Sequence, residues 1–192
     1  MADQLTRTHP LQAWVPAFEA LPDAVRITAE PYVAMAGVRV DPAVAAGLTV
    51  RGAVLPTVPN TWTPSRDGRL VWLGPDEWLV TSTSTAPEAL EEELRTALGP
   101  LGGSAVDVSA QRIGLRISGS RAREVLAKGC SIDLHPRVFG RGSSAQTVLA
   151  HAGIVLLALD DADLVLLVRS SFAGHLATWL LDAALEFTPV RA

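Results

Sequence analysis

The chain has 192 residues and a formal net charge of −4, with 48% hydrophobic and 19% charged residues. This length buries enough apolar surface for one domain or for two small domains packed together. The weak negative charge excludes the electrostatic pattern of a nucleic-acid-binding protein. The single cysteine excludes a disulfide framework within the chain and is typical of a reducing compartment.

The N-terminal segment predicts an arm. The first residues contain no apolar core of a signal peptide, and the longest apolar run, GIVLLALDD at 153–161, is too short to span a bilayer. We therefore expect a soluble, cytoplasmic protein. Residues 1–30 hold three prolines and predict an extended arm with a short helix around 14–20. The apolar stripe of that helix must cover its own domain or a partner.

The next segment, residues 31–103, predicts a first half of mixed strands and one helix. Strand character is found at 32–40 and 48–55, and a proline-rich irregular loop follows at 56–68. A hairpin is expected at 69–82, turning at Gly-Pro-Asp. A helix is expected at 86–99, with a proline in its first turn and glutamates near its positive end.

The second half, residues 104–192, has the same kinds of element. Strand character at 104–119 precedes a helix at 120–130. A strand pair is expected within 145–171, turning near residues 160–163. The last helix is expected at 172–187, where apolar residues recur at spacings of three and four.

The two halves share one order of elements. Residues 68–99 and 152–186 both read as strand, acidic turn, strand, polar junction and amphipathic helix. This pattern predicts an α+β fold with mixed, mostly antiparallel sheets and covering helices, built from two pseudo-repeated β-β-α units. We expect two coupled sheet layers, each covered by helices.

The segment AKGCSIDLHPRVF, residues 127–139, holds Cys130 with His135 five positions later. Neither a helix nor a strand brings two side chains at this spacing together, although a loop can. The histidines at 135, 151 and 175 match no metal-ligand spacing. The aspartates near residue 160 lie in a predicted turn, where backbone geometry favours Asp. These patterns indicate structural roles, and we predict no catalytic, cofactor-binding or metal-binding residue in this chain.

Some residues are better candidates for contacts with a partner. Basic residues gather between 121 and 141, where they form either a solvated surface or a site for an acidic partner. Two tryptophans lie in irregular segments and are either lids of the core or interface anchors. The candidate interface residues are Trp14, Trp62, Arg121, Arg123, Lys128, His135 and Arg137.

Several motifs together resemble the gamma subunit of heterotetrameric sarcosine oxidase. They are LGPDEWLV, the run from VDVSAQRIGLRISG through AKGCSIDLHPRVF, AQTVLAHAGIVLL, and VRSSFAGHLATWLLDAALEF, in order across residues 35–187. That subunit is similar to the folate-binding domain of the aminomethyltransferase of glycine cleavage (T-protein). In the aminomethyltransferase an acidic pair follows the Gly-Gly-Ile segment, whereas here Leu156 and Leu157 occupy that place.

The resemblance implies a noncatalytic accessory subunit of a complex that oxidatively demethylates sarcosine to glycine. It implies alpha, beta and delta subunits as partners, with alpha as the main contact, and neither nucleic acid nor membrane. FAD, FMN, NAD, zinc and tetrahydrofolate are expected on the other subunits. Two alternatives remain, a stand-alone folate-binding or one-carbon transfer module and a cysteine-dependent enzyme.

Overall fold

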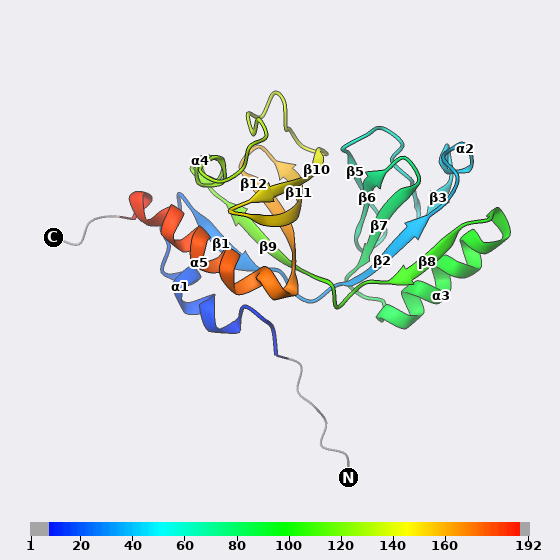
Figure 1. Ribbon diagram of the computed structural model, residues 1–192, viewed down its shortest axis with the longest axis horizontal. Helices are drawn as coiled ribbons and strands as arrows, with labels where there is room; N and C mark the ends of the chain where they lie inside the picture. Colours follow the sequence, from blue (N-terminus) through cyan, green and yellow to red (C-terminus); the bar gives the residue numbers. More distant parts are fainter. Residues whose placement is uncertain (1–7, 189–192) are drawn as a thin grey trace, which may run out of the picture.

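The computed structural model describes residues 8–188, and two five-stranded sheets form its framework (Figure 1). Residues 1–7 of the predicted arm and 189–192 lie outside the described residues. Sheet A has the strand order β1 (Arg26–Ala29), β9 (Arg112–Ser118), β12 (Asp163–Arg169), β11 (Ala152–Asp160) and β10 (Ser144–Leu149). Sheet B has the order β5 (Trp62–Pro64), β6 (Arg69–Gly74), β7 (Glu77–Ser82), β2 (Ala34–Arg39) and β8 (Ser104–Asp107).

Neighbouring strands in both sheets run antiparallel, and helices cover their outer faces. A small hairpin joins β3 (Thr49–Val50) to β4 (Ala53–Val54). The α-helices are α1 (Val15–Glu19), α2 (Pro42–Ala45), α3 (Pro87–Leu98), α4 (Ala122–Ala127) and α5 (Ala173–Ala184). Short 3-10 turns are η1 (Gln12–Trp14), η2 (Gly99–Leu101), η3 (Ser170–Phe172) and η4 (Leu185–Phe187). The predicted α+β fold with antiparallel sheets is confirmed.

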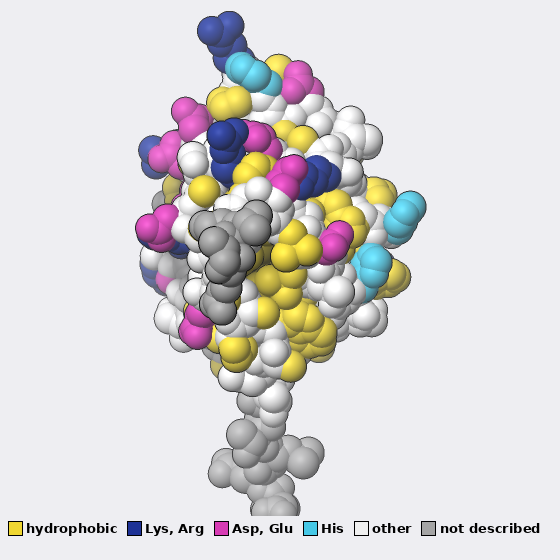
Figure 2. Space-filling view, turned by 90° about the vertical axis from the view of Figure 1, so that its left-hand side faces the viewer, with side chains coloured by type: hydrophobic (Ala, Val, Ile, Leu, Met, Phe, Trp, Pro, Cys, Tyr) yellow, Lys and Arg dark blue, Asp and Glu magenta, His cyan; other side chains and the backbone are white. Residues whose placement is uncertain are grey.

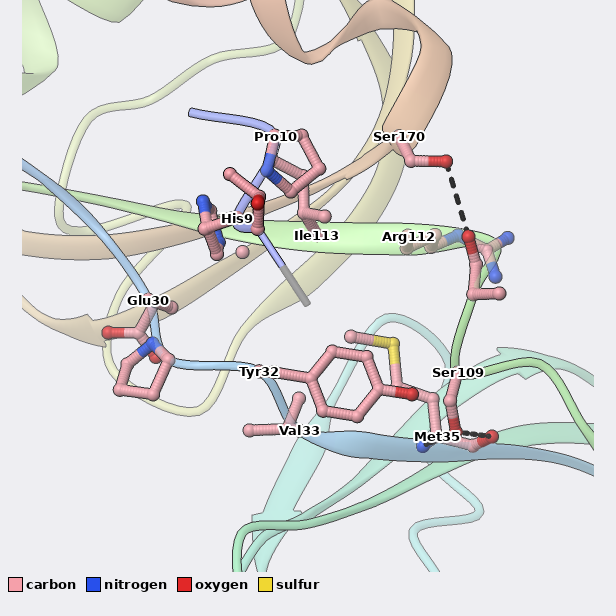
Figure 3. A pocket seen from close by; sticks show the side chains of 14 residues that line it. His9, Pro10, Glu30, Tyr32, Val33, Met35, Ser109, Arg112, Ile113 and Ser170 are labelled. Carbon is pink, nitrogen blue, oxygen red and sulfur yellow. Dashed lines mark hydrogen bonds between the residues drawn. The ribbon is translucent and has the colours of Figure 1, made fainter. Parts of the chain in front are cut away.

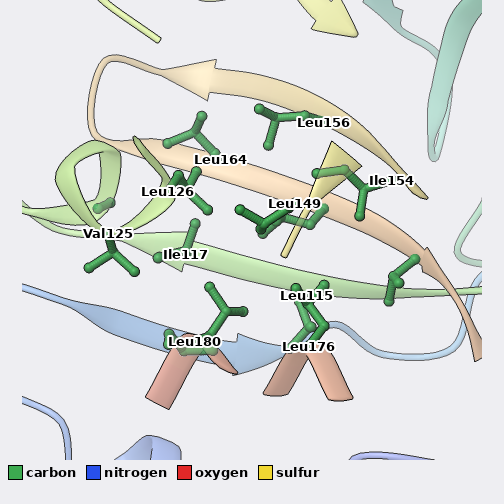
Figure 4. Close-up of a cluster of buried hydrophobic side chains, with 14 of the residues drawn as sticks. Leu115, Ile117, Val125, Leu126, Leu149, Ile154, Leu156, Leu164, Leu176 and Leu180 are labelled. Atoms are coloured by element: carbon green, nitrogen blue, oxygen red, sulfur yellow. The ribbon is translucent and has the colours of Figure 1, made fainter. Parts of the chain in front are cut away.

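The central strands of each sheet are buried on both faces. Along β12, Leu164 and Leu166 point into a core shared with α4 and α5, while Val165 and Leu167 point to sheet B. Figure 4 shows the first of these cores, between sheet A and its helices. The second face forms the inter-sheet core, whose buried members are Met35, Val71, Leu73, Leu79, Val155, Leu157, Val165 and Leu167. Burial on both faces explains the uninterrupted apolar runs of β11 and β12.

The predicted repeat is present in the structure. One unit is β6–β7–α3 and the other is β11–β12–α5, each an antiparallel hairpin followed by a twelve-residue helix. The sheets also exchange strands. β1, from the N-terminal segment, forms the edge of sheet A, and β8, which follows residue 103, forms the edge of sheet B. The chain therefore crosses between the sheets twice, from β1 to β2 and from β8 to β9 (Figure 1).

The described part of the N-terminal arm packs on its own domain. Its short helix, α1, follows η1 and lies within the predicted range 14–20. Leu11 and Phe18 are buried in the core of sheet A, and Trp14 packs against that core. The apolar stripe of the arm thus covers sheet A and its helices.

Two local expectations were wrong because turns interrupt the strands. Residues 48–55 form the hairpin β3–β4 instead of one strand, with Arg51 and Gly52 at φ of 48° and 77°. The segment 145–171 holds three strands instead of two. Its first turn lies at Ala150 and His151, with φ of 49° and 68°. Gly, Asn and Asp are the residues that usually adopt such positive φ values, so the sequence does not predict a turn here.

Replacing Leu115 by Ala tests the core of sheet A. Leu115 is fully buried there, so we expect Leu115→Ala to lower the free energy of unfolding by about 2–5 kcal/mol. Val58 is 64% exposed, and Val58→Ala is the control, with a change within about 0.5 kcal/mol. Urea denaturation of the full chain measures both values. Equal losses in the two variants would contradict the assignment of this core.

Candidate functional site

Cys130 and His135 lie in different environments. Cys130 is buried, its Sγ lies 4.0 Å from Oγ1 of Thr147, and its backbone pairs with Leu149 of β10. His135 is exposed, and its Nδ1 accepts a hydrogen bond from the backbone N–H of Arg137 at 3.2 Å. No hydrogen bond joins the two side chains in residues 8–188. The structure does not bring them together as a nucleophile and its base.

Close packing explains why a glycine precedes Cys130. A Cβ at Gly129 would lie 2.5 Å from the ring of Trp179 in α5 and 3.2 Å from the backbone nitrogen of Ala150. The segment after α4 is therefore held between α5 and the β10–β11 turn. The Lys-Gly-Cys sequence is a packing motif that joins α4, α5 and sheet A.

The candidate basic residues at the two ends of α4 bind their own chain. Arg121 forms an ion pair with Glu124 at 2.6 Å, and Lys128 forms one with Glu186 at 2.5 Å. Both cations also lie over the ring of Phe187, at 5.9 and 5.0 Å from its centroid. Figure 2 views the molecule from the side where α4 and α5 lie in Figure 1. It shows cations interspersed with carboxylates above a group of hydrophobic side chains.

Arg123 holds two loops in place. Its guanidinium donates hydrogen bonds to the backbone carbonyls of Leu134, Asp160 and Asp161. Burial lowers the pKa of Arg123, and the charge of Asp161 opposes that shift. This side chain therefore joins the segment after α4 to the β11–β12 turn. His135 and Arg137, by contrast, are exposed at the end of that segment.

The two candidate tryptophans are half-buried and hydrogen-bonded within the chain. Nε1 of Trp14 donates to Oγ1 of Thr178 at 3.3 Å. Nε1 of Trp62 donates to the carbonyl of Ala158 at 3.0 Å and so joins sheet B to sheet A. The guanidinium of Arg69 lies 6.0 Å from the centre of the Trp62 ring. Both tryptophans act as anchors between elements.

Sequence reasoning missed a buried ionic cluster around Arg51. This arginine is 6% exposed, pairs with Asp67 at 2.8 Å and also pairs with Glu93 of α3. Its guanidinium donates a further hydrogen bond to Thr85 at 2.9 Å. The cluster connects the β3–β4 turn, the β5–β6 turn, the segment before α3 and the middle of α3. The only signal in the sequence was an arginine beside glycine in a short turn.

Asp67 is the acidic centre of this cluster. Burial raises the pKa of Asp67, but hydrogen bonds from Arg51, Ser82 and Ser84 outweigh that effect and hold the pKa well below its usual range. Asp67 is therefore ionised and paired at neutral pH. Such a carboxylate stabilises the fold and is not available as a general base.

A cavity of ≈ 340 Å³ lies where the chain crosses between the sheets (Figure 3). Tyr32, Met35 and Ile113 give it mostly apolar walls. Ser109, which lines the cavity, already forms hydrogen bonds within the chain. Its Oγ accepts a hydrogen bond from the backbone N–H of Met35 at 2.8 Å and donates one to Asp107 at 2.5 Å. Among residues 8–188, no three His, Cys, Asp or Glu side chains converge as metal ligands. The cavity can hold an apolar group. Its titratable lining residues include His9, whose Nδ1 accepts the backbone N–H of Leu11 at 3.1 Å, and Glu30, which lies 3.8 Å from Arg69.

Comparison with known proteins finds similarity to sarcosine oxidase subunits. A family model described as "Sarcosine oxidase, gamma subunit family" matches residues 36–186. The sarcosine oxidase subunit gamma of Corynebacterium sp. (strain P-1) is 42% identical over 120 residues, which cover 62% of this chain and 57% of that protein. The subunit of strain U-96 is 40% identical over 119 residues with the same coverage. The chain thus matches little more than half the length of these curated relatives.

Two solved structures are similar to the chain. A chain of heterotetrameric sarcosine oxidase from Corynebacterium sp. U-96, in complex with pyrrole 2-carboxylate, has a TM-score of 0.85 at 31% identity. The alignment covers 97% of this chain and 98% of that one. Aminomethyltransferase T of the glycine cleavage system from Bartonella henselae has a TM-score of 0.60 at 14% identity, covering 87% of this chain and 48% of that one. This second similarity confirms the predicted aminomethyltransferase-like fold. No helix among residues 8–188 is long and apolar enough to cross a membrane.

Gly129→Ala tests the packing motif before Cys130. We expect it to destabilise the chain by about 1–3 kcal/mol, because the added methyl group overlaps Trp179 and the neighbouring backbone. Gly99→Ala is the matched control, since a Cβ there meets no atom within 4 Å. Thermal unfolding compares the variants. If Gly99→Ala proved as destabilising as Gly129→Ala, the packing explanation would be wrong.

Asp67→Asn tests the ionic cluster through pH. Because the pKa of Asp67 is lowered on folding, its contribution to stability is complete above the unfolded-state pKa of about 3.9 and is lost as the pH falls below it. We expect the variant to be less stable at pH 7 and to depend less on pH between about 5 and 2. Urea midpoints across this range measure the effect. Asp23→Asn changes a carboxylate that is 91% exposed, so its stability should vary with pH as that of the wild type does. If the stability of Asp67→Asn varied with pH in the same way as that of the wild type, the assignment of the ionic cluster would be wrong.

Proposed function

The chain belongs to the sarcosine oxidase gamma subunit family, and on this basis we propose that it is a noncatalytic accessory subunit of a heterotetrameric sarcosine oxidase. The complex would oxidatively demethylate sarcosine to glycine. The observation that carries the proposal is the end-to-end structural similarity to one chain of a heterotetrameric sarcosine oxidase, with 97% and 98% of the two chains aligned. Such a similarity favours the same place in an assembly.

The contacts of the candidate side chains support a noncatalytic role. Cys130 is buried, and Asp67 is neutralised by Arg51. Nucleophilic catalysis requires an accessible thiolate next to a base, and neither condition is met at Cys130. We therefore assign the chemistry, with FAD, FMN, NAD, zinc and tetrahydrofolate, to the other subunits of the complex.

A stand-alone folate-binding or one-carbon transfer module is less well supported. The shared fold with aminomethyltransferase T favours it. However, the place of the acidic pair is taken by Leu156 and Leu157, which are both fully buried in apolar cores. A carboxylate at this place is therefore missing.

For the partners, we propose alpha, beta and delta subunits, with alpha as the main contact. Of the candidate interface residues, His135 and Arg137 have exposed side chains beyond α4, and Arg121 and Lys128 lie exposed on the neighbouring surface. Trp14, Trp62 and Arg123 would act indirectly by fixing the segments that carry the surface. We also propose a cytoplasmic location for the complex.

Co-expression of the tagged full chain with the other three subunits tests the proposal. We expect a yellow complex that produces peroxide with sarcosine, whereas the isolated chain should be colourless and inactive. Complexes that carry Cys130→Ala should keep activity within about twofold, because a noncatalytic thiol contributes nothing to the barrier.

Two results would contradict the accessory role. The first is purification of the chain alone from the co-expressing cells, with saturable quenching of its tryptophan fluorescence by tetrahydrofolate. That result would favour the folate-binding module. The second is loss of turnover by Cys130→Ala in a fully assembled complex.

A further inference from the structure

One row of side chains crosses sheet A at the end where the strands leave the inter-sheet core. Arg112 of β9 lies opposite Arg169 of β12. Continuing the β11–β12 ladder by one position places Gly153 beside Arg169, and Val148 of β10 lies opposite Gly153. Across the adjacent strands β9, β12, β11 and β10, the row therefore holds two cations, then a glycine without a side chain, and then an apolar residue.

The two cations of this row form no ion pair in the part of the chain that the structure describes. Within residues 8–188, neither Arg112 nor Arg169 has a carboxylate oxygen within 4 Å, and Nη1 of Arg112 donates to the amide oxygen of Gln111 at 2.6 Å. Arg116, four residues along the same strand, is paired with Asp163 through both nitrogens of its fork. The fold thus neutralises one arginine of β9 and leaves the other unneutralised.

The surroundings of Arg112 disfavour its charged form. Burial lowers the pKa of Arg112, the adjacent charge of Arg169 lowers it further, and Glu77 of sheet B partly compensates. The carboxylate of Glu77 is itself paired with Arg39 at 2.9 Å. Two adjacent guanidinium groups with no carboxylate of their own attract an anion, and their fork geometry suits a carboxylate.

The surface beside the cations is hollow and is lined by the polar side chains of Gln146 and Thr147 as well as by apolar ones. It forms a groove of ≈ 330 Å³ along Gly153, Val155 and Val148. A Cβ at Gly153 would meet no atom within 4 Å, and Val148 is 50% exposed. Because β10 is the edge strand of sheet A, this groove continues to the side of the sheet. A groove open along an edge suits a chain segment that passes over it.

We propose that this row is a docking surface for an acidic segment of a partner subunit. A carboxylate of the segment would lie between Arg112 and Arg169, and a neighbouring apolar side chain would cover Gly153 and contact Val148. This inference rests on the proposed function and names the chemistry of the partner segment. The docking surface is a second contact, separate from the four exposed candidate residues around α4. Its cations have no carboxylate partner in the described chain.

Charge reversal in the co-expressed complex tests the docking surface. We expect Arg112→Glu with Arg169→Glu to lower the amount of alpha subunit retained by the tagged chain at least about tenfold. Arg169→Glu alone, at an exposed position, should lower it in the same direction even if the double variant unfolds. Arg112→Lys with Arg169→Lys should restore most of the retention. Retention by the wild type should fall as the NaCl concentration rises.

Arg66→Glu with Arg141→Glu is the matched control. Both arginines are exposed, neither has a carboxylate within 4 Å in the described residues, and the change in charge is the same. This variant should retain the alpha subunit as the wild type does. A thermal unfolding curve for each purified chain separates loss of docking from loss of folding.

Each other outcome overturns the inference in a distinguishable way. If Arg169→Glu remains folded and retains the alpha subunit like the wild type, the docking surface is wrong while the accessory role stands. If the wild type retains no other subunit, both proposals fall. Succinate that binds the isolated chain saturably through Arg112 and Arg169, with assembly unchanged in the variants, would make the groove a small-molecule carboxylate site instead.

Discussion

The inter-sheet core is the contact on which the rest of the structure depends. Each sheet contributes a cluster of buried apolar side chains to this core, and neither could leave its cluster in water without a large loss of hydrophobic stabilisation. Each outer face is occupied by helices, so every central strand is buried on both sides. The two sheets therefore stabilise each other, and the chain behaves as one body of four layers.

Strand exchange strengthens this dependence. β1 precedes the strands of sheet B in the chain but belongs to sheet A, and β8 follows those strands and completes sheet B. Neither half of the sequence can complete its own sheet without crossing to the other. Polar contacts add to the coupling, since Trp62 donates to sheet A from sheet B and Gln146 donates from sheet A to the carbonyl of Leu73 at 2.7 Å.

The distribution of charge fits the proposed accessory role. Arg51, Arg116 and Arg123 are bound within the chain, where carboxylates or carbonyls accept hydrogen bonds from their guanidinium groups. Arg112 and Arg169 have no carboxylate within 4 Å among residues 8–188, in a chain whose net charge is negative. Keeping a half-buried arginine such as Arg112 without a carboxylate partner is costly, which makes this position informative about contacts outside the chain.

The sequence by itself determined the kind of elements and their order. Periodicity placed the helices later seen as α3 and α5, the hairpins before them and the repeat that they form, because these are local properties of apolar spacing and turn residues. It also determined the family resemblance. The tertiary structure alone decided which strands pair, since β1 and β8 find partners far along the chain and nothing local specifies them. It alone showed Arg51 as a buried ionic centre and Arg112 beside Arg169, because both depend on strand register and on charges brought together only by folding.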